Sequence, residues 1–89
     1  MEIKFPNKLR SYRRYKGYSL KKVARILGYA NTSTVAKWER GVAAPSLVQV
    51  FRLARIYGID VHLLYDELWE SVESEVSLLV QDTEPNITN

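Results

Sequence analysis

Residues 19–41 read SLKKVARILGYANTSTVAKWERG. Ser19 is a residue type favoured at helix N-termini, and the apolar positions after it recur every three or four residues as far as Gly28. Asn31 or Thr32 is suited to begin a second helix that ends before the next glycine. The stretch therefore predicts two short helices joined by a tight turn.

Glycines divide the rest of the chain in the same way. They stand at Gly17, Gly28, Gly41 and Gly58, a spacing typical of helices that each end in a left-handed glycine. No segment between them alternates with period two for long, so we expect no sheet. The predicted fold class is all-α, a compact five-helix domain with an extended C-terminal helix. The expected helices begin at Pro6 (running to about Lys16), after Ser19, after Asn31 or Thr32, at Pro45-Ser46 and after Asp60 (running to about Val80).

The apolar residues at helical spacing predict which side chains face the core. They are Leu9 and Tyr12 in the first helix, Val23, Ala24 and Leu27 in the second, Val35 and Trp38 in the third, and Leu47, Val50, Phe51, Ala54 and Tyr57 in the fourth.

Charge is strongly segregated along the 89 residues. The net charge is only +3, but all thirteen Lys and Arg lie before residue 60, together with just two acids. Residues 1–59 thus carry +11 and residues 60–89 carry −8. A basic block of this size is the electrostatic footprint of a protein that binds a polyanion, and the alternative is scattered solubilising charge.

Composition also limits the chemistry. The chain has no Cys and one His, His62, so disulfides and thiolate or His-based metal sites are excluded. No nucleophile–base pair is visible, and we expect no enzymatic activity, no cofactor and no metal. No apolar run reaches the roughly 18–20 residues of a membrane span. The N-terminus has no signal-peptide stretch, so a cytoplasmic location without membrane contact is expected.

Several motifs taken together resemble the lambda-repressor/Cro-like helix-turn-helix proteins, the XRE family. The similarity runs from about Leu9 to Leu68. It implies that the third helix enters the major groove of double-stranded DNA, while the second helix and the end of the first lie on the backbone. The motifs are Gly17-x-Ser19, Val23-Ala24-x-x-Leu27-Gly28, Ser33-Thr34-Val35, Trp38-Glu39-Arg40-Gly41, Pro45-Ser46-Leu47, Leu53-Ala54 and Tyr57-Gly58-Ile59.

The resemblance implies base contacts from Thr32, Ser33, Ala36 and Lys37. Hydroxyl groups can pair with either kind of base pair, and a lysine can reach guanine O6/N7 or a phosphate. None of the four side chains forms a bidentate fork, so direct readout should be modest. Thr32 and Ser33 can also act as helix caps, and both roles are compatible.

Contacts to the DNA backbone are expected from residues around the first three helices. They are Arg10, Arg14, Tyr18, Ser19, Lys21, Lys22, Asn31 and Arg40, with packing as the alternative role for the tyrosine. Three features depart from the family pattern: Leu20 replaces a common Gln, the turn 28–31 is one residue longer, and the loop 42–44 has no basic residue.

Glu39 follows the core-facing Trp38, and the family resemblance implies that it pairs with Arg13 to orient the third helix. The alternative role for Arg13 is a phosphate contact. Removing one partner of such a pair would leave a costly unpaired charge.

The last predicted helix carries an apolar stripe longer than a small core requires. An exposed stripe of this kind usually marks an interface, and we expect a homodimer through it, although the stripe could instead fold back on its own domain. The expected interface residues are Leu68, Val72, Val76 and Leu79. The predicted units are a DNA-binding domain at 1–68, a helical extension at 69–80 and a disordered tail at 81–89.

The sequence thus predicts a sequence-specific DNA-binding transcriptional regulator, a repressor of the phage or mobile-element type, associated with the nucleoid through DNA. One alternative is an antitoxin-like protein whose C-terminal tail binds a partner protein. Another is a protein–protein adaptor on the same fold, which the basic block argues against. RNA binding lacks an aromatic platform.

Overall fold

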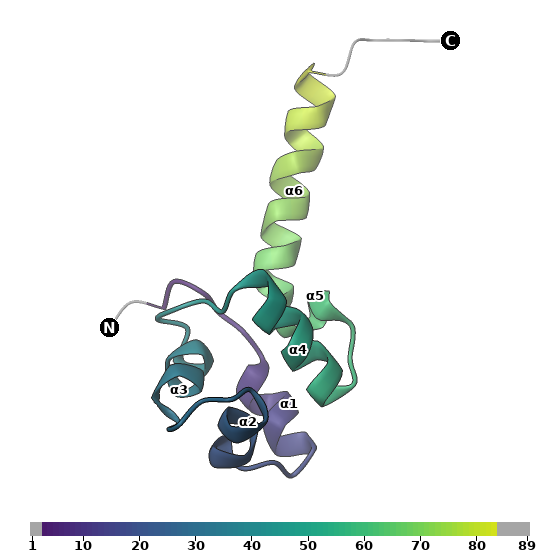
Figure 1. Cartoon of the computed structure of the whole chain (residues 1–89). Helices are drawn as coiled ribbons and strands as arrows, with labels where there is room; N and C mark the ends of the chain where they lie inside the picture. Colours follow the sequence, from purple (N-terminus) through teal and green to yellow (C-terminus); the bar gives the residue numbers. More distant parts are fainter. Residues whose placement is uncertain (1–2, 84–89) are drawn as a thin grey trace.

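The computed structural model describes residues 3–83, and within them every regular element is an α-helix, which confirms the all-α fold class (Figure 1). The six helices are α1 (Leu9–Tyr15), α2 (Leu20–Ile26), α3 (Ser33–Arg40), α4 (Leu47–Tyr57), α5 (Val61–Leu64) and α6 (Asp66–Thr83).

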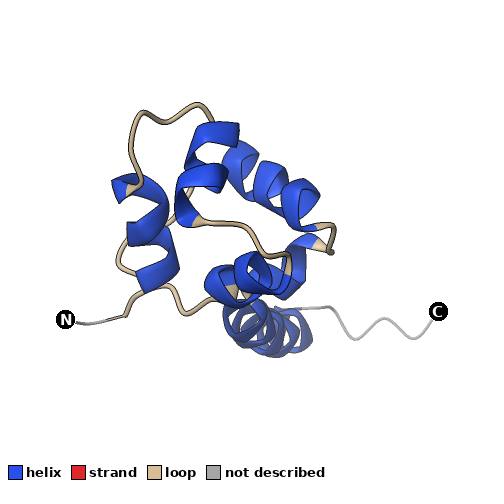
Figure 2. Cartoon of the chain, turned by 90° about the horizontal axis from the view of Figure 1, so that it is seen from below, coloured by secondary structure: helices blue, strands red, loops and turns tan. Residues whose placement is uncertain are grey.

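The first five helices surround a small core, and the view from below shows helices joined by loops (Figure 2). Every one of these helices contributes at least one buried apolar side chain, so no helix can be removed without opening the core. The buried residues are Leu9, Val23, Ala24, Val35, Trp38, Leu53, Ala54, Tyr57 and Leu64.

Helix ends agree in part with the predicted signals. The four glycines have positive φ angles between 68° and 86°, and each follows a helix. The Ser19 hydroxyl accepts a hydrogen bond from the Lys22 N–H, as an N-cap does. Asp60 stands at the N-cap position of α5, but its side chain makes no capping hydrogen bond.

The start of the first helix was placed too early. Pro6 lies outside α1, which begins at Leu9 because the Asn7 carboxamide oxygen accepts a hydrogen bond from the Leu9 N–H. Asn7 also donates to the carbonyl oxygens of Phe5 and Trp38, both at 2.9 Å. One side chain therefore begins α1 and ties it to the end of α3.

The segment before α1 packs against the end of α3. The N–H groups of Lys4 and Phe5 both donate to the Gly41 carbonyl, at 3.0 and 2.9 Å. A Cβ atom on Gly41 would lie 2.8 Å from the Phe5 carbonyl oxygen and 2.7 Å from Ile3 Cγ2. Gly41 is thus required both for its left-handed backbone and for this close approach.

The prediction for the fourth helix was partly wrong. Leu47 and Phe51 are 68% and 49% exposed, whereas Leu53, which the helical pattern did not select, is completely buried. The apolar sector of α4 is wider than the face covered by the neighbouring helices, so its edge residues reach solvent.

The C-terminal helix was predicted as one element and is two. The backbone breaks at Tyr65, with φ −132° and ψ 51°, and α6 then runs to Thr83. Lys8 holds this corner: its N–H donates to the Leu64 carbonyl, and its ammonium lies 3.1 Å from the Asp66 carboxylate. Burial at the corner raises the pKa of Tyr65 to about 12.

Helix α6 projects from the body of the domain instead of folding back on it (Figure 1). Leu68 is half-buried against its own domain, and every described residue after it is exposed, including Val72, Val76 and Leu79. The predicted boundaries at 68 and 80 fall inside α6, and residues 81–83 are helical where a disordered tail was expected. Residues 84–89 of that tail lie outside the described residues.

Candidate DNA-binding surface

Two buried side chains hold α3 against the core. Val35 and Trp38 are 1% and 5% exposed, and both point inward from the same face of the helix. The Trp38 indole packs edge-on against Tyr29, whose hydroxyl accepts a hydrogen bond from the Gln49 amide at 2.8 Å. The anchored face leaves the opposite side of α3, with Ser33, Lys37 and Arg40, in solvent.

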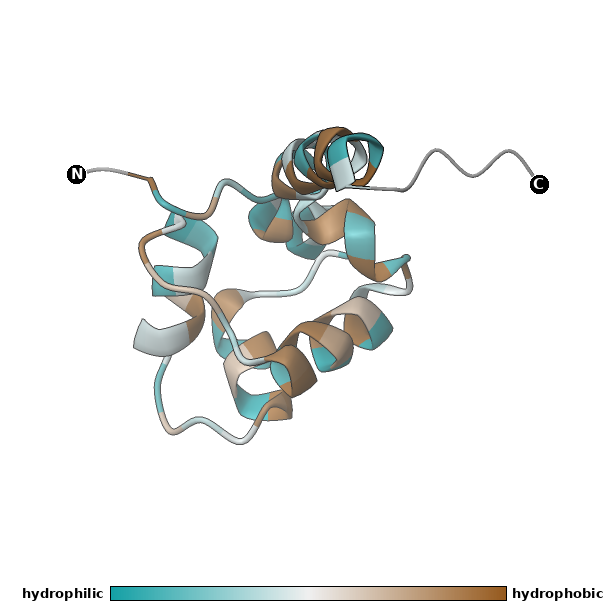
Figure 3. Cartoon of the chain, turned by 90° about the horizontal axis from the view of Figure 1, so that it is seen from above, coloured by the Kyte–Doolittle hydropathy of each residue, from teal (hydrophilic) through white to brown (hydrophobic). Residues whose placement is uncertain are grey.

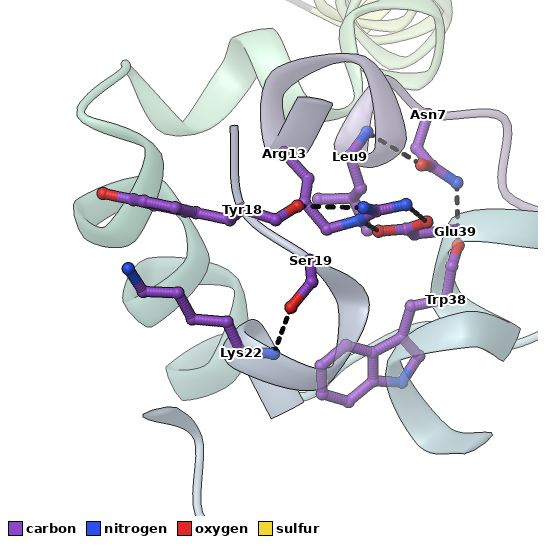
Figure 4. Close-up of polar contacts among 8 residues, drawn as sticks. All are labelled: Asn7, Leu9, Arg13, Tyr18, Ser19, Lys22, Trp38 and Glu39. Atoms are coloured by element: carbon purple, nitrogen blue, oxygen red, sulfur yellow. Dashed lines mark hydrogen bonds and ion pairs between the residues drawn. The ribbon is translucent and has the colours of Figure 1, made fainter. Parts of the chain in front are cut away.

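An ion pair joins α1 to α3 beside this anchor (Figure 4). Arg13 Nε donates to Glu39 Oε2 at 2.6 Å, and a second guanidinium nitrogen donates to Oε1 at 3.1 Å. A third hydrogen bond runs from Arg13 to the Tyr18 carbonyl in the α1–α2 turn. The side chains are only 11% and 7% exposed, and the hydrogen bond that Arg13 donates to Glu39 raises the pKa of Arg13 further. The pair expected from the family resemblance is therefore present, and it fixes three segments together.

The start of α3 shows which residue caps the helix. Asn31 Oδ1 accepts hydrogen bonds from the Ser33 N–H at 3.0 Å and from the Ser33 hydroxyl at 2.6 Å. Thr32 stands at the formal N-cap position but makes no side-chain capping bond. Of the two alternatives, Asn31 makes the capping hydrogen bonds, and the Thr32 hydroxyl is not used in the cap.

The four residues expected to contact bases lie on one helix end. Ser33 and Lys37 are exposed, and Thr32 and Ala36 are half-buried. The one-residue-longer turn is accommodated before α3, where the Tyr29 N–H donates to the Ala24 carbonyl. The spacing of 32, 33, 36 and 37 then places these residues along one side of α3.

A shallow hollow lies between α1, α2 and α3 on this side of the molecule. It is lined by Arg10, Leu20, Ala36 and Arg40, with the Arg13–Glu39 pair beside them. Leu20 also packs partly against the core, so the residue that replaces the family's Gln has a structural role. Because Glu39 neutralises Arg13, Arg10 and Arg40 carry the net positive charge of the hollow.

The other expected backbone contacts surround the start of α2. Arg14, Lys21 and Lys22 are exposed. The Lys22 ammonium lies 4.7 Å from the centre of the Tyr18 ring, a cation–π distance. The half-buried Tyr18 therefore packs against the core and against Lys22, as the alternative role required.

Asn7 is the residue of this region that sequence reasoning missed. Its three hydrogen bonds connect the N-terminal segment, α1 and α3. Figure 4 draws the two that join it to Leu9 and Trp38. The available signal is an Asn two positions before the first apolar residue of a helix, a residue type that is favoured at helix starts.

Residues 3–83 hold no group of three or more acidic, His or Cys side chains placed to bind a metal ion. In that same part of the chain, no helix is long and apolar enough to cross a bilayer.

Two short helices at a tight turn, with the second anchored by its inner face and basic residues around its outer face, define a helix-turn-helix module. The helix-turn-helix family matches residues 9–64, more than half of the chain, and the protein belongs to that family. It is a DNA-binding regulator of the XRE type. No curated protein and no solved structure matches the chain.

Proposed function

We propose that this protein is a sequence-specific transcriptional repressor that reads the major groove with α3. The observation that supports this most is the rigid attachment of α3, through Trp38 and the Arg13–Glu39 pair, with its polar face left in solvent. A helix held in one orientation can present the same side chains to every binding site, which is the requirement for direct readout.

In this proposal Thr32, Ser33, Ala36 and Lys37 contact base edges. The Thr32 hydroxyl is not used in the helix cap, and its methyl group suits a thymine methyl. The Ser33 hydroxyl donates to Asn31, so toward DNA it acts as an acceptor. Lys37 is exposed and long enough to reach a guanine or the adjacent phosphate.

Contacts to the DNA backbone come from exposed basic side chains on either side of α3. Arg10 and Arg40 flank the hollow between α1, α2 and α3, and a phosphate seated there would meet both guanidinium groups. Arg14, Lys21 and Lys22 extend the same basic surface around the start of α2. Ser19 and Asn31 are already engaged in caps, so their contribution is through backbone N–H groups at helix starts.

The exposed stripe of α6 supports a homodimer. Val72, Val76 and Leu79 are 54%, 45% and 54% exposed, which is costly for apolar side chains in water. A two-fold dimer would read two half-sites about one helical turn, roughly 34 Å, apart. The units proposed for the chain are accordingly a DNA-binding domain that ends with α5 and a dimerisation helix, α6.

The same stripe supports one second candidate, an antitoxin-like protein in which α6 binds a partner protein while the basic module binds DNA. An acidic amphipathic helix that projects from its domain suits both roles.

Selection of bound duplexes from a random pool tests the proposal. We expect a two-fold symmetric consensus whose affinity falls steeply with salt, because each neutralised phosphate releases counterions. Lys37→Ala should weaken binding to the selected duplex by roughly 1–3 kcal/mol if it contacts a base. Lys16 is an exposed lysine outside the proposed DNA-binding surface, so Lys16→Ala is the matched control. Enrichment of no sequence, or equal losses from both variants, would contradict readout by α3.

A further inference from the structure

Besides the stripe of α6, a second exposed apolar surface lies between the C-terminal end of α2 and α4. It is a groove lined by Ile26, Leu27, Val48, Phe51 and Ile56. Ile26, Val48 and Phe51 are 52%, 54% and 49% exposed, so the groove is open to solvent. We call it the α2–α4 groove.

The rim of the α2–α4 groove is basic. Arg52 and Arg55 line it, and within residues 3–83 neither forms a salt bridge. Among the described residues, the side chain of Arg52 hydrogen-bonds only to Gln49, one turn earlier. The groove therefore combines a large apolar floor with two arginines that have no anionic partner within residues 3–83, which suits an acidic amphipathic segment.

The described part of the chain contains such a segment. Helix α6 has six acidic residues and no Lys or Arg among its 18 residues. Its apolar stripe is exposed, and Glu73 and Glu75 flank that stripe on opposite sides. Figure 3 shows hydrophobic and hydrophilic residues alternating around α6, which is viewed close to its axis. Residues 70–83 would span about 21 Å, enough to cover the two turns of α4 that line the groove.

If α6 packed against α6 of a second copy, the apolar stripes would be buried, but the acidic side chains beside them would gain no basic partner. Two such helices would pack with their axes 8–10 Å apart and bring Glu73 and Glu75 of each chain, which flank the stripe, toward those of the other chain without a cation between them. Docking of α6 into the α2–α4 groove buries the same stripe and places Glu73 and Glu75 near Arg52 and Arg55. The second arrangement removes both the exposed apolar surface and the unpaired charge.

We propose that the protein dimerises by reciprocal exchange, with α6 of each copy docked in the α2–α4 groove of the other. This inference rests on the homodimer of the proposed function and names the surface that receives α6. The exchange closes under a two-fold axis, since each copy offers one helix and one groove. The ion pairs in such a contact make dimerisation weaker at high salt.

A charge exchange between the two surfaces tests this arrangement. One variant carries Arg52→Glu and Arg55→Glu, and the other carries Glu73→Lys and Glu75→Lys. In each variant alone, groove and helix have the same sign, so we expect the dimer Kd to rise at least tenfold in sedimentation equilibrium at low salt. In an equimolar mixture each groove faces a helix of opposite sign, so we expect a heterodimer with an affinity near that of the unchanged protein.

Matched controls change the same charges elsewhere. The first control, Lys4→Glu with Lys16→Glu, changes exposed lysines away from the groove. The second control, Glu67→Lys with Glu70→Lys, changes acidic side chains on the face of α6 opposite the stripe. We expect each control pair to change the Kd less than threefold, and far-UV circular dichroism checks that all variants are folded.

Pairing of α6 with α6 gives a different pattern. The arginine variant would then dimerise as the unchanged protein does, because its α6 is unchanged. The mixture would also form a heterodimer, since Glu73 and Glu75 of one helix would face lysines of the other. A normal Kd for the arginine variant alone is therefore the sign of α6–α6 pairing. That pattern overturns the exchange but leaves the homodimer intact. A monomeric unchanged protein at all concentrations overturns both the exchange and the homodimer, while duplex selection still reports on DNA binding separately.

Discussion

Removing Glu39 should destabilise the domain far more than removing an average surface charge. Glu39→Ala leaves the Arg13 guanidinium, whose side chain is 11% exposed, with one remaining acceptor, the Tyr18 carbonyl. Two charge-assisted hydrogen bonds are lost at the same time. Breaking a buried pair by removing one partner costs about 3–5 kcal/mol.

A loss of that size is a large part of the protein's total unfolding free energy. A chain of 89 residues is expected to have an unfolding free energy of about 4–13 kcal/mol. At roughly 4–8 °C per kcal/mol, a 3 kcal/mol loss lowers Tm by about 12–24 °C. Replacing both partners, as Arg13→Met with Glu39→Leu, should cost much less, because no unpaired charge then stays buried.

Urea unfolding followed by tryptophan fluorescence measures these differences. Trp38 is 5% exposed and reports on the core, whereas Trp69 is 53% exposed, so Trp69→Phe provides a background in which Trp38 reports alone. A double-mutant cycle of the unchanged protein, Arg13→Met, Glu39→Leu and the double variant gives the coupling energy directly. A Glu39→Ala cost below about 1 kcal/mol, typical of an exposed pair, or a double variant as unstable as the sum of the singles, would refute the reasoning.

Three further effects can be measured. Gly28→Ala should cost about 1–2 kcal/mol of unfolding free energy for its left-handed backbone alone, and Gly41→Ala should cost clearly more, because its Cβ would also overlap neighbouring atoms. Asn7→Ala removes three hydrogen bonds and should cost about 2 kcal/mol in the same urea assay. Hydrogen bonding from Lys8 lowers the pKa of Asp66 below 3.8 in the folded protein. The pair therefore stabilises the fold at pH values above the pKa of Asp66 in the unfolded chain, and this stabilisation is lost as the pH falls through the pKa of Asp66 in the folded protein. Carboxyl NMR titration should therefore give Asp66 a higher pKa in Lys8→Met.

Each of these has its own contrary result. Equal costs at Gly28 and Gly41 would show that the approach of the N-terminal segment to Gly41 is not maintained in solution. An Asn7→Ala variant as stable as the parent would mean that water replaces the carboxamide fully. An unchanged Asp66 pKa in Lys8→Met would mean that the ion pair does not persist at the corner before α6.

Much of the domain body was predictable because its signals are local. Ser19 and Ser46 cap α2 and α4, and the glycines end helices where their positive φ is required. The Arg13–Glu39 pair was expected only through the family resemblance, since 26 residues separate its partners and no periodicity links them.

The structure differs from the sequence-based predictions where contacts between distant segments determine the local conformation. The break at Tyr65 has no glycine or proline signal, and it follows from Lys8, which holds the Leu64 carbonyl and the Asp66 carboxylate together. Asn7 begins α1 in place of Pro6 because its carboxamide bonds to the end of α3 as well as to α1.

The sequence by itself determined the number of the early helices, the helix-turn-helix and the separation of a basic body from an acidic end, since helix propensity, caps and charge are properties of neighbouring residues. Only the tertiary structure decided which apolar side chains are covered. Phe51 and Val72 carry the same helical pattern as core residues yet stay exposed, while Leu53 is buried. A pattern shows that a helix has an apolar face, but burial depends on whether another element packs against that face, and that is set by the fold as a whole.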